Sequence, residues 1–273
     1  MGAGQALGQS SAHENVWPLQ HPVGRSIAQV AARHLQPVVL ELGGKAPFIV
    51  LPGADIASAV ATATFGAFMN QGQTCMTTQR LILHKDVSAA FQQGLIERVA
   101  GLVIGDPTDP RTQIGCLIDA RATQRMHDLL DDAVNKGATV LVGGGMRGPA
   151  FEPAVVADVT PDMRLYTEEA FGPLVPLIEV QSVDEAVRIA NESEYGLSAA
   201  VFTAHLRPAW DIASRLKTGV VHINDVTLNA EPQMPFGGVK SSGYGRFGGR
   251  YGLNEFTEVR WITVQSKPRT FPL

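Results

Sequence analysis

The chain has few cysteines, few aromatic side chains and no surplus of positive charge. Among its 273 residues there are two cysteines, aromatic residues make up 7%, and the formal net charge is −4. Two cysteines are too few for the disulfide framework of a small secreted domain. Without a basic surplus the chain also lacks the electrostatic footprint of a nucleic-acid-binding protein, so we expect no nucleic-acid partner.

Long apolar runs are missing as well. No stretch reaches the roughly 20 apolar residues that a membrane-spanning helix needs. Residues 1–6 lack the positive region and the apolar core of a secretory signal. We therefore expect a cytoplasmic protein with no membrane partner. A hydrophobic share of 45% is nevertheless sufficient for a sizeable core.

Apolar strand patterns alternate with helical patterns along most of the chain. Strands are expected at residues 38–40, 48–51, 80–84, 140–142, 154–159, 175–180, 199–202 and 220–223. Helices are expected at residues 26–34, 55–69, 86–103, 120–136, 183–191 and 207–216. Asp55 and Asp86 should cap two of these helices, and Gly137 should end a third. This alternation predicts an α/β fold with a largely parallel sheet, and residues 38–51 should form a strand, a Gly-Gly turn and a second strand.

A single cysteine provides a candidate nucleophile. Cys75 follows polar residues and a glycine at 70–74, which indicates a loop entering the strand at 80–84. Glu41 is a candidate base that could accept the thiol proton or activate a water. Each has a structural alternative, because Cys75 could be a small buried hydrophobe and Glu41 an exposed strand residue beside a turn. Cys116, between aliphatic residues, is interpreted as a packing residue.

Two further segments have the character of functional loops. Glu169 lies two residues before Phe171 and just before a strand. There a carboxylate can accept both hydroxyls of a ribose, while an aromatic ring packs on a flat ligand; the alternative is an acidic turn with a core phenylalanine. Residues 234–246 are too rich in glycine for a packed element and suit a loop that closes over a pocket.

Other residues point to no additional chemistry. The three glycines at 143–145 do not form a phosphate loop and are interpreted as a turn. His222 and the other histidines lack metal-ligand spacing and are interpreted as structural, so no metal site is expected.

Four motifs, taken in order, resemble those of the aldehyde dehydrogenase superfamily. They are LELGGK at 40–45, GQTC at 72–75, EAFGP at 169–173 and PFGGVKSSG at 235–243. The resemblance covers about residues 23–264, and the segment at 243–249 is most similar to salicylaldehyde and vanillin dehydrogenases. It implies an enzyme that oxidises an aldehyde, in its closest relatives an aromatic one, with NAD or NADP.

The resemblance also implies a role for each motif. Cys75 would attack the aldehyde to give a thiohemiacetal and then a thioester, and its backbone N–H would be an oxyanion donor. Glu41 would activate the hydrolytic water. Glu169 would hold the nicotinamide ribose, Phe171 would pack near the nicotinamide, and Gly43 would permit a close backbone approach.

Members of that superfamily are nearly twice as long, and the difference is N-terminal. The resemblance implies an irregular segment at 1–22, a remnant of the dinucleotide-binding domain at 23–40, a catalytic domain at 41–249, and a C-terminal helix and oligomerisation strand at 250–273. The expected fold is therefore a parallel-sheet catalytic domain with most of the dinucleotide-binding domain missing. Residues 38–42 should be partly bare as a result.

Several interpretations remain open for the isolated chain. It could form a homo-oligomer through the strand expected at 257–264. It could instead be a non-catalytic or regulatory chain that joins a full-length relative in a hetero-oligomer, or a residual cysteine esterase that uses Cys75 and Glu41 without a cofactor. A truncated gene model is a further alternative.

Overall fold

The structure is a computed structural model that describes residues 20–272. The predicted irregular segment 1–22 therefore lies almost entirely outside the described residues. Its last residues, 20–22, already belong to the helix α1 (Gln20–Arg33).

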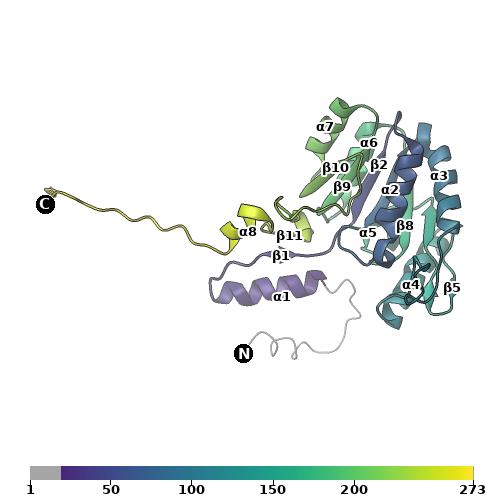
Figure 1. The fold of residues 1–273 in the computed structure, drawn as a ribbon, viewed down its shortest axis with the longest axis horizontal. Helices are drawn as coiled ribbons and strands as arrows, with labels where there is room; N and C mark the ends of the chain where they lie inside the picture. The colour runs from purple at the N-terminus through teal and green to yellow at the C-terminus, as the bar shows by residue number, and fades with distance from the viewer. Residues whose placement is uncertain (1–19, 273) are drawn as a thin grey trace.

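A seven-stranded sheet forms the centre of the molecule (Figure 1). Its strands are β2 (Ala46–Val50), β3 (Thr78–His84), β4 (Thr139–Val142), β7 (Ala154–Ala157), β8 (Leu174–Val180), β9 (Ser198–Phe202) and β10 (Val220–Ile223). The order across the sheet is β10-β9-β2-β3-β8-β7-β4, and only the β4–β7 pair is antiparallel. The predicted α/β fold with a largely parallel sheet is confirmed.

Helices cover both faces of this sheet. The longer ones are α2 (Ile56–Phe68), α3 (Lys85–Ala100), α4 (Ala120–Asn135), α6 (Val183–Glu192) and α7 (Leu206–Arg215). Side chains alternate along a strand, so Phe48 and Val50 pack with α2 and α3, whereas Ile49 packs in the core that contains α4, α6 and α7. The sheet is thus buried on both faces, as a parallel sheet requires.

Two helix starts and one helix end can be compared with the predictions. Asp55 caps α2 as predicted, since its carboxylate accepts from the N–H of Ser58 at 3.1 Å. Asp86 does not cap α3, which begins one residue earlier. The imidazole of His84 is the cap and accepts from the N–H of Asp86, which lies in the first turn. Gly137 adopts a positive φ of 100° just after α4, as the end of a helix favours.

A second, smaller group of elements lies beside the main sheet (Figure 1). It contains α1, the short helix α8 (Gly249–Glu255), and two short strands, β1 (Leu40–Glu41) and β11 (Gly243–Tyr244), which pair antiparallel. The predicted order of strand, Gly-Gly turn and strand is present, with the first strand at 40–41, but the two strands do not pair with each other. β2 is already paired on both sides, with β3 and β9, so β1 pairs with a distant strand.

The remaining short elements lie in the connections. They are the 3₁₀ turns η2 (Met69–Gly72) and η3 (Lys240–Ser242), the helix α5 (Arg164–Thr167), and the hairpin of β5 (Met146–Arg147) and β6 (Ala150–Phe151). The glycines at 143–145 lie between β4 and β5, and Gly143 and Gly144 adopt positive φ, as expected for a turn.

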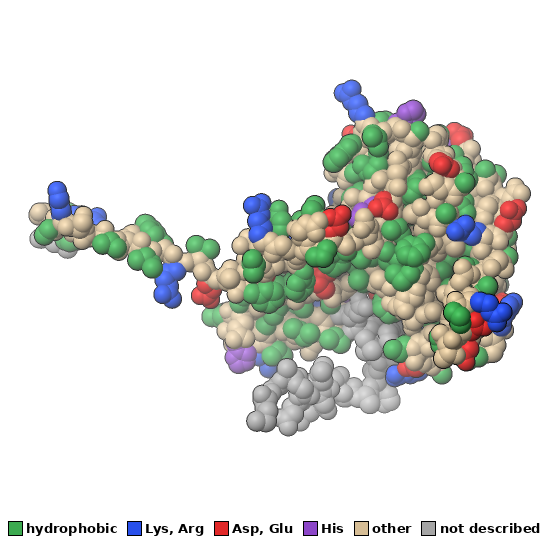
Figure 2. Space-filling view, in the orientation of Figure 1, with side chains coloured by type: hydrophobic (Ala, Val, Ile, Leu, Met, Phe, Trp, Pro, Cys, Tyr) green, Lys and Arg blue, Asp and Glu red, His purple; other side chains and the backbone are tan. Residues whose placement is uncertain are grey.

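The smaller group exposes apolar side chains. Ile27 and Val30 on α1 are 46% and 42% exposed, and Val38 and Val39 are half-buried. Hydrophobic side chains also gather around α8 and β11 (Figure 2), among them Tyr244, Leu253 and Phe256. Residues 38–42 are partly bare, as predicted, although Leu40 itself is buried.

Residues 257–264 do not form a strand within this chain. They extend away from α8 (Figure 1), and Val259 and Trp261 are almost fully exposed. A strand exists only when its backbone pairs with a neighbour, and nothing between residues 20 and 272 pairs with this segment. The oligomerisation strand was expected to pair with another chain, so it stays a prediction.

Cys116 is exposed, so its interpretation as a packing residue is also wrong. The segment around it alternates, with Leu117 facing inward and Ile118, like Cys116, facing outward. Apolar neighbours in the sequence do not bury a residue that points to the opposite side of an extended backbone.

Candidate active site

Cys75 lies in the turn between η2 and β3, which confirms the predicted loop entering a strand. Before it, Asn70 and Gln71 adopt left-handed φ angles of 51° and 55°. Residues with side chains adopt this conformation at a cost of about 1–2 kcal/mol each. The turn is secured from within by Thr77, whose hydroxyl donates to the carbonyl oxygen of Gly72 at 3.1 Å.

Glycines allow three of the four motif segments to meet at this turn. A side chain at Gly44 would place its Cβ 2.3 Å from the carbonyl oxygen of Cys75. A Cβ at Gly72 would lie 2.4 Å from the carbonyl oxygen of Gly172. The backbones of residues 40–45, 72–75 and 169–173 are therefore in direct contact, as only glycine permits.

Glu169 is fully buried between these segments. One carboxylate oxygen, Oε1, accepts from the N–H of Gly44 at 2.9 Å, while Oε2 has no hydrogen-bond partner. A Cβ at Gly43 would lie 2.2 Å from that free oxygen, so the carboxylate fills the space left by the absent side chain. Burial raises the pKa of Glu169 to about 7, against the opposing influence of its bond from Gly44 and the nearby Lys45.

Glu41 is placed on β1, with both carboxylate oxygens buried and unpartnered. Burial raises the pKa of Glu41 to about 7, and the positive charge of Arg246 offsets this only partly. Because both of its carboxylate oxygens are buried, Glu41 is not the ordinary exposed strand residue of the alternative interpretation. A carboxyl that titrates near neutrality is well suited to accept a proton in catalysis.

The environment of Cys75 favours the neutral thiol. Burial is the main cause that raises the pKa of Cys75, and the negative charges of Glu169 and Glu41 raise it further. The backbone N–H groups of Met76 and of Cys75 itself act in the opposite direction. Because the thiolate is the reactive form, this thiol needs a proton acceptor close by, and Glu41 is close enough for its charge to act on the sulfur.

Two buried cations support the site, and the sequence reasoning missed both. Lys45 donates to the carbonyl oxygen of Glu168 at 2.6 Å, and burial lowers the pKa of Lys45 to about 7. Arg80 donates to the carbonyl oxygens of Lys45, Ile189 and Ala190. Arg80 thereby fastens the start of β2 to α6. The available signal was a charged residue at the start of an apolar strand, where only internal hydrogen bonds allow burial.

The other predicted residues lie around this centre. Phe171 is half-buried with φ 54°, in the turn whose Gly172 contacts Gly72. The fourth motif joins the site through Ser242, which is fully buried and was not predicted. Its hydroxyl donates to the carbonyl oxygen of Gly43 at 2.7 Å and accepts from the N–H of Gly196. All four motifs are therefore connected by direct contacts.

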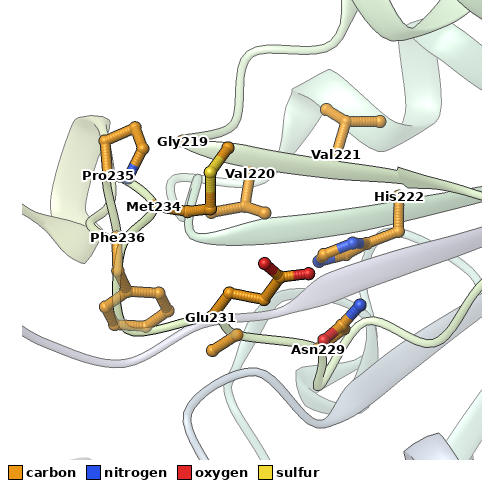
Figure 3. Close-up of a pocket in the computed structure, with 10 residues that line it drawn as sticks. Gly219, Val220, Val221, His222, Asn229, Glu231, Met234, Pro235 and Phe236 are labelled. Atoms are coloured by element: carbon orange, nitrogen blue, oxygen red, sulfur yellow. The ribbon is translucent and has the colours of Figure 1, made fainter. Parts of the chain in front are cut away.

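A pocket of about 350 Å³ lies between β10 and the loop at 229–236 (Figure 3). Met234 and Phe236 line it, in agreement with the predicted loop over a pocket, but its walls do not include Cys75 or Glu41. His222 also lines it, and its Nε2 is buried without a partner. The interpretation of His222 as a structural residue stays a prediction, and burial lowers the pKa of His222.

The described residues contain neither a metal-ligand cluster nor a membrane-spanning helix. Across residues 20–272, histidine, cysteine and acidic side chains form no cluster of three that could hold a metal ion. No helix in the same range is both long and apolar enough to cross a bilayer.

This fold, with its four converging motifs, defines a class of enzyme. The model of the aldehyde dehydrogenase family matches residues 20–262, and the chain belongs to that family. It is 51% identical over 251 residues to a vanillin dehydrogenase of Pseudomonas sp., covering 92% of this chain and 52% of that protein. It is 43% identical, with the same coverage, to a benzaldehyde dehydrogenase [NAD(+)] of Pseudomonas putida.

A solved structure agrees with these relatives. The crystal structure of a salicylaldehyde dehydrogenase from Pseudomonas putida, complexed with salicylaldehyde, matches with a TM-score of 0.90 and 42% identity. The match covers 93% of this chain and 53% of that chain. The chain thus spans about half the length of the curated relatives it matches.

Proposed function

We propose that this chain carries the catalytic chemistry of an aldehyde dehydrogenase that oxidises an aromatic aldehyde to a carboxylic acid with NAD or NADP. The observation that carries the proposal is the convergence of the four motifs on Cys75, beside a buried carboxyl group with no partner, Glu41. The names of the vanillin, benzaldehyde and salicylaldehyde dehydrogenases to which the chain is similar support an aromatic substrate.

The proposed reaction begins at the sulfur of Cys75. The thiolate attacks the aldehyde carbon and forms a thiohemiacetal, while the thiol proton passes to Glu41 directly or through water. The backbone N–H of Cys75 donates to the developing oxyanion, and a comparable donor contributes about 3–4 kcal/mol elsewhere. After oxidation to a thioester, Glu41 first releases the thiol proton to solvent and then takes a proton from water, which attacks the thioester carbonyl, breaks the C–S bond and releases the acid and the Cys75 thiolate.

Three residues would hold the nicotinamide part of the cofactor. Glu169 offers an unpartnered, buried carboxylate oxygen that suits a ribose hydroxyl, and Gly43 beside it has no side chain of its own to block a ligand once that carboxylate turns toward the ribose. Phe171 follows in the same turn. A bound NAD or NADP would supply the hydride acceptor that the oxidation requires.

The test uses the 273-residue chain at high concentration with NAD or NADP and either vanillin or benzaldehyde. NADH or NADPH absorbance should rise, and it should not rise with the Cys75→Ser variant. A second assay follows hydrolysis of p-nitrophenyl acetate without cofactor. Ester turnover that depends on Cys75, with no reduced cofactor formed by either aldehyde, would contradict the oxidation proposal and favour the cysteine esterase.

A further inference from the structure

A residue outside the four motifs holds the backbone next to Cys75. The hydroxyl of Thr227 donates to the carbonyl oxygen of Met76 at 2.7 Å, across a sequence separation of 151 residues. Thr227 is fully buried, and Met76 is 8% exposed. The backbone of the residue that follows the candidate nucleophile is therefore anchored by a side chain from the connection after β10.

The hydrogen bonds around Thr227 determine one another. A hydroxyl has a single proton, and that of Thr227 is used for Met76. In the 2.9 Å contact between the hydroxyls of Thr78 and Thr227, Thr78 must therefore be the donor. The backbone of Thr227 is fixed as well, because Ser198 donates to its carbonyl oxygen at 2.7 Å. Each of these hydroxyl groups is buried, so water cannot replace a lost protein partner.

The packing leaves this network little room to rearrange. A Cβ at Gly66, on α2, would lie 2.6 Å from the hydroxyl oxygen of Thr78 and 3.1 Å from a methyl group of Val226. The hydroxyl pair therefore fits against the bare backbone of a helix. This supports a single geometry for Thr227 and for the carbonyl group that it binds.

Met76 matters because it directly follows Cys75 in the same turn. Thr227 holds the carbonyl group of Met76, and the N–H of Thr77, in the same peptide group, donates to the carbonyl oxygen of Thr74 at 3.0 Å. The turn that carries Cys75 is therefore fixed on both sides of the residue. The backbone N–H of Met76 also lowers the pKa of a thiol that burial, Glu169 and Glu41 all raise.

We propose that Thr227 is a positioning residue of the active site, which anchors Met76 and so fixes the turn that presents the Cys75 thiol. The inference rests on the proposed role of Cys75 as nucleophile. The connection between β10 and the fourth motif lies outside all four motifs, and the inference gives this connection a function. The conservative variant Thr227→Ser keeps the donor, whereas Thr227→Val keeps the shape and removes it.

The test measures the thiol itself, without aldehyde or cofactor. The full chain and both variants are alkylated with iodoacetamide over a range of pH, and labelling of each cysteine is followed by peptide mass spectrometry. Cys116 is exposed and serves as the internal control. In Thr227→Val, Cys75 should react about fivefold more slowly at neutral pH, which is the factor expected for one lost hydrogen bond. Its pH profile should move to higher pH, while Thr227→Ser stays near the wild type and Cys116 does not change.

If Thr227 has a purely structural role, Thr227→Val will have a lower melting temperature, but the pH profile of Cys75 alkylation will be the same as in the wild type. This result would overturn the proposal. If Thr227→Val does not fold, Thr227→Ala decides, because it also removes the donor to Met76 and adds no bulk to the buried site. A shift of the Cys75 profile in that variant supports the proposal, and an unchanged profile overturns it. Missing aldehyde oxidation in the wild type would count only against the proposed function.

Discussion

The carbonyl oxygen of Cys75 lies 2.3 Å from the point where a Cβ of Gly44 would stand. Gly44→Ala must therefore displace the backbone of the candidate nucleophile, since neither atom belongs to a flexible side chain. We expect the free energy of unfolding to fall by about 1–3 kcal/mol, as at other overpacked sites. The rate of Cys75 alkylation should fall by a larger fraction than the free energy of unfolding does. Urea unfolding and iodoacetamide labelling check this. Gly252→Ala is the control, because its Cβ would meet only ordinary contacts; equal effects of the two variants would contradict the prediction.

Glu41→Gln removes the proposed base and keeps the size of the side chain. Hydrolysis of p-nitrophenyl acetate should show an initial burst of p-nitrophenol of normal amplitude, followed by turnover slowed roughly a hundredfold or more, the usual contribution of a general base. Because the pKa of Glu41 is raised to about 7, wild-type turnover should rise with pH through neutrality, and that limb should be absent in the variant. Unchanged steady-state turnover would exclude Glu41 as the base.

Stability should fall as the pH rises from about 4.5 to about 7. Burial raises the pKa of Glu169 in the folded chain to about 7, above its ordinary value of 4.5. Over this range the folded state holds a proton that the unfolded state has lost, so the stabilisation is complete below pH 4.5 and disappears as pH passes through about 7. For Glu169 alone the change is at most about 3 kcal/mol. Melting curves should show a smaller pH dependence in Glu169→Gln, and an identical slope would contradict the assignment.

Arg80→Met should destabilise the chain strongly. The variant leaves the carbonyl oxygens of Lys45, Ile189 and Ala190 without the donor that Arg80 provides. A buried acceptor that loses its partner costs about 1–3 kcal/mol, so we expect a total of at least about 3 kcal/mol by urea unfolding. Arg111→Met is the matched control, since Arg111 is exposed and pairs only with Asp109 close by. A mild effect at Arg80 would mean that water replaces the guanidinium.

We propose that the exposed segment 257–264 makes the chain associate with a second copy or with a longer relative. Its apolar side chains Val259, Trp261, Ile262 and Val264 are 74–101% exposed, far more than an isolated chain favours. A chain that ends at Phe256 should sediment as a smaller species than the 273-residue chain and melt at the same temperature. Equal sedimentation of the two would argue against association through this segment.

The regular elements and the motif positions were predictable, whereas the contacts that hold the site were not. Strands such as β3 and β8 can be predicted from their own apolar residues, and the loop that carries Cys75 can be predicted from the polar residues before it. In contrast, Ser242 meets Gly43 across 199 residues, and Thr227 meets Met76 across 151. Serine and threonine are common in loops, so nothing local distinguishes these two. The pairing of β1 with β11 was missed for the same reason, because it depends on which strands already flank β2.

The position of β2 affects how the chain is made. This strand leaves the ribosome well before β9, yet it lies between β3 and β9, and the register with β9 joins Ile49 to Val201. One edge of β2 therefore waits for roughly 150 further residues, which takes on the order of ten seconds or more of synthesis. During that interval an apolar strand with an open edge is available to other nascent chains. Recombinant production should accordingly improve with slower induction at lower temperature or with extra chaperone.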